Sequence, residues 1–176
     1  MKQKVNKKNL QTSSDNMKKR PWNRIDAAVY SICSQESPES FNMNIATYIT
    51  AVSMQPKIFL CAIYEGTKTL SNVRVNPVFI LQLLSDDQYK LVTLLGKQSG
   101  NKINKISRLR KRNELTKWKN FPVLKNSIAW MELKAVDVFQ TGDHYCFVCE
   151  MIGYKNVNPG NALSLETLRQ NKIISV

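Results

Sequence analysis

Short apolar runs, each closed by turn residues, set the strongest constraint on the fold of this chain. The longest uninterrupted run covers about six residues, Ile58 to Ile63, whereas a membrane-spanning helix needs roughly 20. Proline, glycine or asparagine follows most of these runs, as is typical of strands joined by tight turns. With 176 residues, 43% of them hydrophobic and 22% charged, the chain has the composition of one packed globular domain.

The pattern predicts a mainly β protein with small helices. Strands are expected at residues 25–34, 41–54, 57–64, 78–84, 127–140 and 144–154. Short helices are expected at residues 70–75, 85–95, 101–112 and 163–172. Thr69 is the expected N-cap of the first helix, and Ser85 with Gln88 predicts a capping box for the second. A β-barrel is the natural closure for six or seven such strands.

The net charge of +13 is concentrated in two segments. Residues 1–24 hold eight basic residues and one acidic residue, and residues 97–125 hold ten basic residues and one acidic residue. We expect residues 1–20 to form a basic, flexible arm and residues 21–176 to form a single domain. Such basic segments suit nucleic acid, a small phosphorylated ligand or simply a solvated surface.

Metal chemistry and export are not indicated. Cys146 and Cys149 lie in a predicted strand, where their side chains point to opposite faces, so they do not chelate one metal easily. His144 is the single histidine of the chain, and no metal site is expected. The first 20 residues lack the apolar segment of a secretory signal. A soluble cytoplasmic protein with reduced thiols is the expectation.

The usual catalytic motifs are absent from the sequence. There is no G-x-S-x-G elbow, no G-x-G-x-x-G loop and no P-loop. Difficult chemistry is therefore expected to belong to a bound cofactor. Two segments, Thr67-Lys68-Thr69 and Ser99-Gly100, each precede a predicted helix, where free N–H groups suit a phosphate. Lys102 or Lys105 would add charge there.

The order of the segments resembles the flavin reductase-like, FMN-binding split-barrel family. The resemblance covers residues 22–176 and rests on several motifs in register. They are Asn44, Thr47, Thr50, Val52, Ser53 and Pro56, then Thr67-Lys68-Thr69, LQLL at 81–84, LGKQSGNKINK at 95–105 and TGDHYCFVCEM at 141–151. Gln82 stands where asparagine is usual, Asn101-Lys102 replaces Arg-Asp, and Cys149 occupies a typical glycine position.

This resemblance implies a split β-barrel homodimer that binds FMN near the subunit interface. Asn44, Thr47, Tyr48 and Thr50 would then lie along the isoalloxazine ring and ribityl chain. Thr67, Lys68 and Thr69 would hold the phosphate, with Ser99, Gly100 and Lys105 closing around it. His144 would contact a nicotinamide donor or a substrate.

The resemblance further implies an NAD(P)H-dependent flavin reductase or a related oxidoreductase, with NADH or NADPH as electron donor. The alternatives are a non-enzymatic FMN-binding electron carrier and, from another class, a nucleic-acid-binding protein that uses the basic segments. The arm contains no aromatic residue before Trp22. It therefore lacks the aromatic platform on which single-stranded nucleic acids stack.

Overall fold

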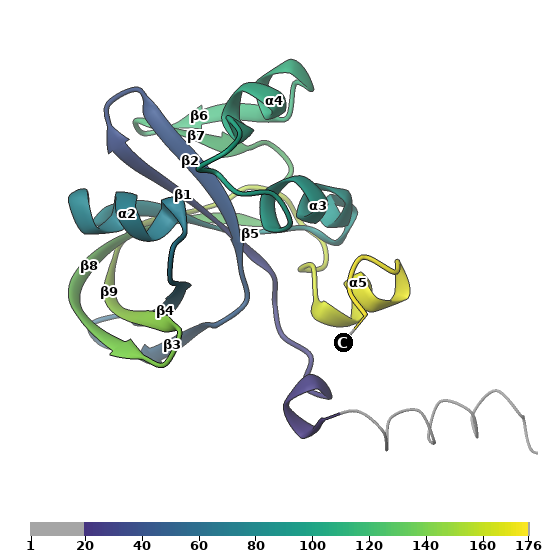
Figure 1. Cartoon of the computed structure of the whole chain (residues 1–176), viewed down its shortest axis with the longest axis horizontal. Coiled ribbons are helices and arrows are strands. Elements are labelled where there is room, and N and C mark those ends of the chain that lie inside the picture. The colour runs from purple at the N-terminus through teal and green to yellow at the C-terminus, as the bar shows by residue number, and fades with distance from the viewer. Residues whose placement is uncertain (1–19, 176) are drawn as a thin grey trace, which may run out of the picture.

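The computed structural model of the chain describes residues 20–175. The predicted arm therefore lies outside the described residues, apart from Arg20, which is exposed. The strands are β1 (Tyr30–Ser37), β2 (Ser40–Ala46), β3 (Ile49–Ser53), β4 (Ile58–Tyr64), β5 (Val78–Leu83), β6 (Leu115–Trp118), β7 (Phe121–Leu124), β8 (Ala129–Thr141) and β9 (His144–Asn156). The helices are η1 (Pro21–Asn23), α2 (Lys68–Val75), η2 (Asp86–Lys90), α3 (Leu91–Gly96), α4 (Lys105–Lys111) and α5 (Leu165–Gln170) (Figure 1).

One seven-stranded antiparallel sheet closes on itself. Its strand order is β2-β1-β5-β8-β9-β4-β3, so β2 and β3 form its two edges. Only Thr47 and Tyr48 separate these edge strands along the chain. In a flat sheet the outer strands would lie roughly 30 Å apart, whereas this connection spans about 10 Å. The sheet must therefore curl into a barrel, which stays split because β2 and β3 do not pair.

This closure corrects the prediction of one strand over residues 41–54. β2 pairs with β1, whereas β3 pairs with β4. The two halves of segment 41–54 therefore lie at opposite edges of the sheet, and the strand is interrupted between them. The break is anchored where the Ala62 N–H donates to the Tyr48 carbonyl at 3.0 Å. The mainly β, split-barrel fold expected from the sequence is confirmed.

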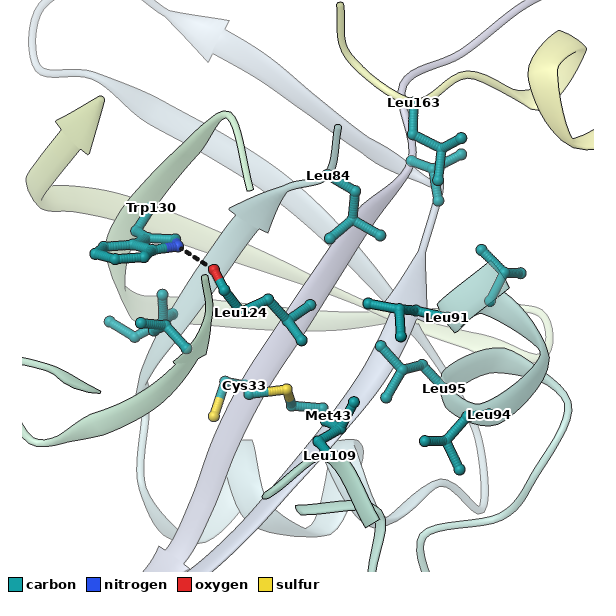
Figure 2. Packing of buried hydrophobic residues seen from close by; sticks show 14 of the residues in the cluster. Cys33, Met43, Leu84, Leu91, Leu94, Leu95, Leu109, Leu124, Trp130 and Leu163 are labelled. Atoms are coloured by element: carbon teal, nitrogen blue, oxygen red, sulfur yellow. Dashed lines mark hydrogen bonds between the residues drawn. The ribbon is translucent and has the colours of Figure 1, made fainter. Parts of the chain in front are cut away.

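Two hydrophobic clusters fill the two faces of the central strands. Ile32 and Phe79 belong to the cluster inside the barrel. Cys33 and Ile80, one residue further on, belong to a second cluster that α3, α4 and the β6–β7 hairpin cover. Figure 2 shows this second cluster around Met43, Leu95 and Leu109, among other residues. Because both faces are buried, β1 and β5 carry apolar side chains at successive positions.

The helix boundaries differ by a few residues from those that the sequence pattern predicts, and α2 begins two residues earlier. Thr67, not Thr69, caps α2, since its hydroxyl accepts the Leu70 N–H at 3.2 Å. The predicted helix over 85–95 is a 3-10 turn, η2, followed by α3. Its capping box is confirmed by the bond from the Ser85 N–H to the Gln88 side chain at 3.1 Å.

The predicted helix over 101–112 is shortened to α4. Its N-cap is Asn104, whose side chain accepts the Ser107 N–H at 2.9 Å. The preceding residues form a turn closed by the Lys102 N–H and the Ser99 carbonyl. The β6–β7 hairpin was not predicted, because β6 is partly exposed and Pro122 argues against a strand.

Gln82 joins the central strand β5 to the β6–β7 hairpin. Its side chain is fully buried, and its Oε1 accepts the Leu124 N–H at 2.6 Å. Its Nε2 donates to the Ser31 hydroxyl at 3.5 Å. The substitution of glutamine for the usual asparagine thus provides a side chain that reaches a neighbouring backbone amide.

We predict that Gln82→Leu lowers the free energy of unfolding by about 1–3 kcal/mol, because it leaves the buried Leu124 amide without an acceptor. The matched control Gln140→Leu removes an exposed glutamine from β8, and its effect should stay within about 0.5 kcal/mol. Urea unfolding followed by tryptophan fluorescence measures both. Equal losses in the two variants would contradict the assigned role of Gln82.

Candidate functional site

Two adjoining cavities lie where the end of β2 meets the turn before α2. The first, of about 450 Å³, lies between β2, the β4–α2 turn and the α3–α4 loop. The second, of about 300 Å³, lies between the β2–β3 connection, β4 and the start of β9. Asn44, Ile45, Tyr64 and Thr69 line both cavities. The two therefore form one elongated site of a size that suits a small organic ligand.

Ten of the eleven residues predicted from the sequence line this site. The first cavity is lined by Asn44, Thr67, Lys68, Thr69, Ser99, Gly100 and Lys105. The second is lined by Asn44, Thr47, Tyr48, Thr69 and His144. Thr50 is the one predicted site residue that lines neither cavity. It is exposed on the edge strand β3, where its hydroxyl lies 3.5 Å from the Ala51 carbonyl.

The start of α2 presents free backbone donors to the first cavity. Gly66, with φ of +73°, turns the chain out of β4. The Thr67 hydroxyl then donates to the Tyr64 carbonyl at 2.8 Å while it caps Leu70. The next two amides, of Lys68 and Thr69, have no acceptor within the helix. The helix dipole adds partial positive charge at this end, so the cavity wall favours an anion.

Asn42 was missed by the sequence analysis and orients Thr69. Its side-chain amide donates to the buried Thr69 hydroxyl at 3.0 Å, which leaves the hydroxyl proton free to donate elsewhere. A Cβ on Gly100 would lie 2.2 Å from the Asn42 side-chain oxygen, so any side chain there would displace Asn42. The signal was the two-residue period of β2, which places Asn42 on the same face as Asn44.

Lys105 brings a buried positive charge to the first cavity. The residue is 2% exposed, and its Nζ donates to the Leu95 carbonyl at 2.5 Å and to the Asn44 side-chain oxygen at 3.3 Å. No carboxylate within residues 20–175 forms an ion pair with it. Burial lowers the pKa of Lys105 to about 8. An anionic group in the cavity would supply the missing counter-charge.

Lys68 differs from Lys105 because it already has a partner. Its Nζ lies 2.5 Å from the Glu36 carboxylate, in an ion pair that is partly exposed. The Asn101 side chain donates to the Gly66 carbonyl at 3.1 Å and ties the α3–α4 loop to the turn before α2. The loop and the turn therefore hold the polar walls of the first cavity together.

Two tyrosine rings flank the His144 imidazole at the second cavity. Its ring centroid lies 5.3 Å from that of Tyr48 and 5.2 Å from that of Tyr64. Its Nδ1 lies 2.6 Å from an Asp143 carboxylate oxygen, which can only accept when ionised, so Nδ1 carries a proton. Tyr48 and Tyr64 are 68% and 54% exposed. This end of the site offers ring faces and the second imidazole nitrogen to a ligand.

The four cysteines are free thiols. Among the described residues no group of three His, Cys, Asp or Glu side chains is placed to hold a metal ion. Cys33, Cys61 and Cys149 are buried free thiols, and Cys146 is half-buried. A hydrogen bond to Cys149, together with burial, raises the pKa of Cys61, which keeps it protonated. No helix in the described part of the chain is long and apolar enough to span a membrane.

Comparison with known proteins identifies the family. The model of the flavin reductase like domain matches residues 22–169, so the chain belongs to this family. A search of curated proteins finds no significant match. The family identified from the sequence motifs is thus confirmed, and with it a flavin reductase-type domain.

Three solved structures share the fold. One is the FMN-binding protein from Thermus thermophilus with bound 1-cyclohex-2-enone, at 20% identity and a TM-score of 0.68 over 78% of this chain and 74% of that one. The styrene monooxygenase flavin reductase from Pseudomonas putida S12 has 15% identity and a TM-score of 0.68, with coverage of 81% and 88%. BorF, the flavin reductase component of a bacterial two-component tryptophan halogenase, has 16% identity and a TM-score of 0.71, with coverage of 89% and 94%.

The depressed pKa of Lys105 predicts a specific pH dependence of stability in the ligand-free protein. Between the folded pKa of about 8 and the ordinary value of 10.5, the unfolded chain binds more protons than the folded one, so stability rises with pH. Lys105→Met removes this contribution. From about pH 7.5 to pH 10 the stability of the wild type should therefore rise by roughly 2 kcal/mol relative to the variant.

Urea unfolding of both proteins at several pH values, in phosphate-free buffer, measures this difference. Other groups that titrate in the same range cancel in the comparison. A difference that stays constant with pH would mean that Lys105 is not desolvated in the folded state.

Proposed function

We propose that the chain is an FMN-binding, NAD(P)H-dependent oxidoreductase of the flavin reductase type that acts in the cytoplasm. The observation that carries the proposal is the ammonium of Lys105, which is buried beside the open start of α2 and has no carboxylate partner among the described residues. Two independent sources of positive potential meet in one cavity, as a phosphate-binding site requires. The family membership supports a flavin nucleotide as the ligand that carries this phosphate.

The residues of the first cavity suit the phosphate end of FMN. The Thr69 hydroxyl and the first amides of α2 would donate to phosphate oxygens, and Lys105 would neutralise the charge. Thr67 sets the start of the helix, while Ser99 and Gly100 close the opposite wall. Gly100 has to lack a side chain, because Asn42 occupies the space beside it.

The residues of the second cavity suit a planar ring system. Asn44 and Thr47 would hydrogen-bond the polar chain and ring edge, and Tyr48 would contact the ring. Bound FMN supplies the hydride-accepting chemistry, for which the protein needs no side-chain base. The protein's part is to orient the ring and to leave one side open to a second ligand.

His144 would contact the nicotinamide or another electron-exchanging substrate. The Asp143 carboxylate fixes its Nδ1–H, so Nε2 is the nitrogen available to that ligand. Tyr48 and Tyr64 flank it and offer exposed aromatic faces to a second ring. A non-enzymatic FMN carrier would share the flavin contacts and would lack this use of His144.

A homodimer would cover the exposed apolar side chains of the barrel. Large apolar residues lie exposed on β3, on β8, on β9 and directly after β3, and they are Val52, Met54, Val136, Val138, Phe139, Ile152 and Tyr154. Apolar surface of this kind marks interaction sites in soluble proteins. We propose that a second copy of the chain covers it.

Thr69→Val tests the phosphate site, because valine keeps the shape of threonine and removes its hydroxyl. FMN affinity should fall about tenfold, the worth of one charge-assisted hydrogen bond. Riboflavin, which lacks the phosphate, should bind the two proteins equally. The control Thr93→Val changes an exposed threonine of α3 and should leave both affinities unchanged. Flavin fluorescence titration measures them, and an unchanged FMN affinity in Thr69→Val would remove Thr69 from the site.

Sedimentation at micromolar concentration tests the homodimer. We expect the wild type to sediment as a dimer and Phe139→Glu to shift it towards the monomer, because a carboxylate would be buried in the interface. Val75→Glu introduces the same charge at an exposed apolar residue of α2 and should leave the dimer intact. A monomeric wild type that still binds flavin would contradict the proposal.

A further inference from the structure

The outer side of α4 carries exposed cations that the proposed flavin site does not use. Arg108, Lys111 and Arg112 are exposed, and they share one side of the helix because residues three and four apart are neighbours. The exposed Lys117 of β6 and the half-buried Lys125 add two more positive charges. We name these five residues the α4 face. None of them lines either cavity of the proposed flavin site.

Hydrogen bonds hold the end of α4 next to the β6–β7 hairpin. The Glu114 N–H donates to the Leu109 carbonyl at 3.1 Å, which directs the chain from α4 into β6. The Lys125 N–H donates to the Glu114 carbonyl at 3.0 Å, and the Lys125 Nζ donates to the Asn113 side-chain oxygen at 2.6 Å. In Figure 1 α4 and the hairpin accordingly lie together at the top of the view. The cations of the helix and of the hairpin thus belong to one surface.

The α4 face has no acidic partner within the described residues. Residues 97–125 hold ten basic residues and a single acidic one, Glu114. No carboxylate within residues 20–175 forms an ion pair with any member of the face. A helix C-terminus favours cations, but Lys117 and Lys125 lie outside α4 and are not explained in this way. Residues 25–96 and 126–176 together hold eight basic and eleven acidic residues, so the positive potential is concentrated at this face.

The α4 face combines this charge with a lack of exposed apolar surface. Among the described residues no exposed large apolar side chain lies between Val75 and Val136. A folded protein partner would need an apolar or aromatic centre in its interface, and a membrane surface is bound through apolar side chains beside basic ones. Phosphate groups of a nucleic acid need cations alone, and protein–DNA interfaces are the more polar and more positive class. The composition of the face therefore favours a nucleic acid.

The aromatic residues and the shape of this region favour a DNA duplex. Proteins that bind single strands stack the bases on exposed aromatic rings. Trp118, the aromatic residue of β6, is half-buried and lies against Trp130 with 5.9 Å between ring centroids. The helix α4 has seven residues, a length of about 10 Å, and lies at the edge of the molecule (Figure 1). The major groove of B-form DNA admits such a helix, whereas that of A-form RNA is too narrow.

We propose that the α4 face binds the phosphate backbone of double-stranded DNA without preference for base sequence. Arg108 and Arg112 would each hold a phosphate through parallel hydrogen bonds, and the three lysines would act as point charges. Contacts to phosphate alone carry no information about the bases. This function is separate from flavin binding, because it uses none of the residues that line the two flavin cavities.

Fluorescence anisotropy of a short labelled DNA duplex of mixed sequence, titrated with the full chain in phosphate-free buffer, tests the proposal. The logarithm of the affinity should fall with the logarithm of the salt concentration with a slope of about −4, as four or five neutralised phosphates require. A variant that combines Lys111→Gln, Arg112→Gln and Lys117→Gln should bind DNA at least about tenfold more weakly, with the slope reduced by about three. All three side chains are exposed, so the variant should fold and bind FMN as the wild type does.

The matched control combines Lys90→Gln, Lys134→Gln and Lys155→Gln, which replaces exposed lysines of η2, β8 and β9. Both triple variants have the same net charge, so the comparison separates the α4 face from the general positive charge of the chain. The control should bind DNA within about twofold of the wild type, because salt screens charges outside the contact surface. Equal losses in the two variants would overturn the proposal, and so would a wild type that does not bind DNA at low salt.

Titrations with duplex RNA, with polyglutamate and with phosphatidylserine vesicles decide between the classes of partner. DNA should bind more tightly than each of these. If one of them binds the wild type more tightly than DNA does and loses this binding in the α4 variant, the face serves RNA, an acidic protein or an anionic membrane, and its assignment to DNA is overturned. FMN titration of the same proteins is independent of this result. A parallel loss of FMN and DNA affinity in the α4 variant would contradict the separation of the two sites.

Discussion

The two-residue connection between β2 and β3 is the constraint on which the rest of the structure depends. Because Thr47 and Tyr48 join the two edges of a seven-stranded sheet, the sheet has to curl until its edges meet. β2 and β3 do not pair at this seam of the barrel, and the second cavity opens there. The same curl brings the end of β4 and the start of α2 beside β2. A cavity at the seam is therefore a consequence of how the barrel closes.

Electrostatics gives the site its chemical character. Any polar lining would be compatible with the closed sheet. Lys105, however, is buried next to the free amides of α2, and no carboxylate of residues 20–175 forms an ion pair with it. Burying a cation in this way costs stability in the free protein. An anionic ligand offsets this cost, so ligand binding and folding are coupled through Lys105. Asn42 of β2 holds the Thr69 hydroxyl in place, and Gly100 leaves the space that the Asn42 side chain occupies.

The sequence allowed the fold class to be predicted, because turn residues and apolar runs are local signals, and ten of the eleven predicted site residues line the two adjoining cavities. The break at Thr47 and Tyr48 could not be predicted, since it depends on which distant strands β2 and β3 pair with. Thr50 was placed in the site by motif, yet the strand face it occupies is set by the pairing of β3. The position of the α2 cap shifted from Thr69 to Thr67 for a local reason, the hydrogen bond to the Tyr64 carbonyl. The burial of Lys105 could not be predicted either, because it depends on how α4 packs against β2 and α3.

The absorption spectrum of the purified protein, recorded anaerobically before and after addition of NADH or NADPH, tests the central claim most directly. A flavin spectrum, either as purified or after reconstitution with FMN or FAD, that bleaches on addition of one of the two nucleotides is the predicted result. A flavin spectrum that neither nucleotide changes would contradict the NAD(P)H-dependent activity and would favour a non-enzymatic electron carrier with the same fold. A protein that stays colourless after reconstitution with either flavin would contradict the flavin site itself.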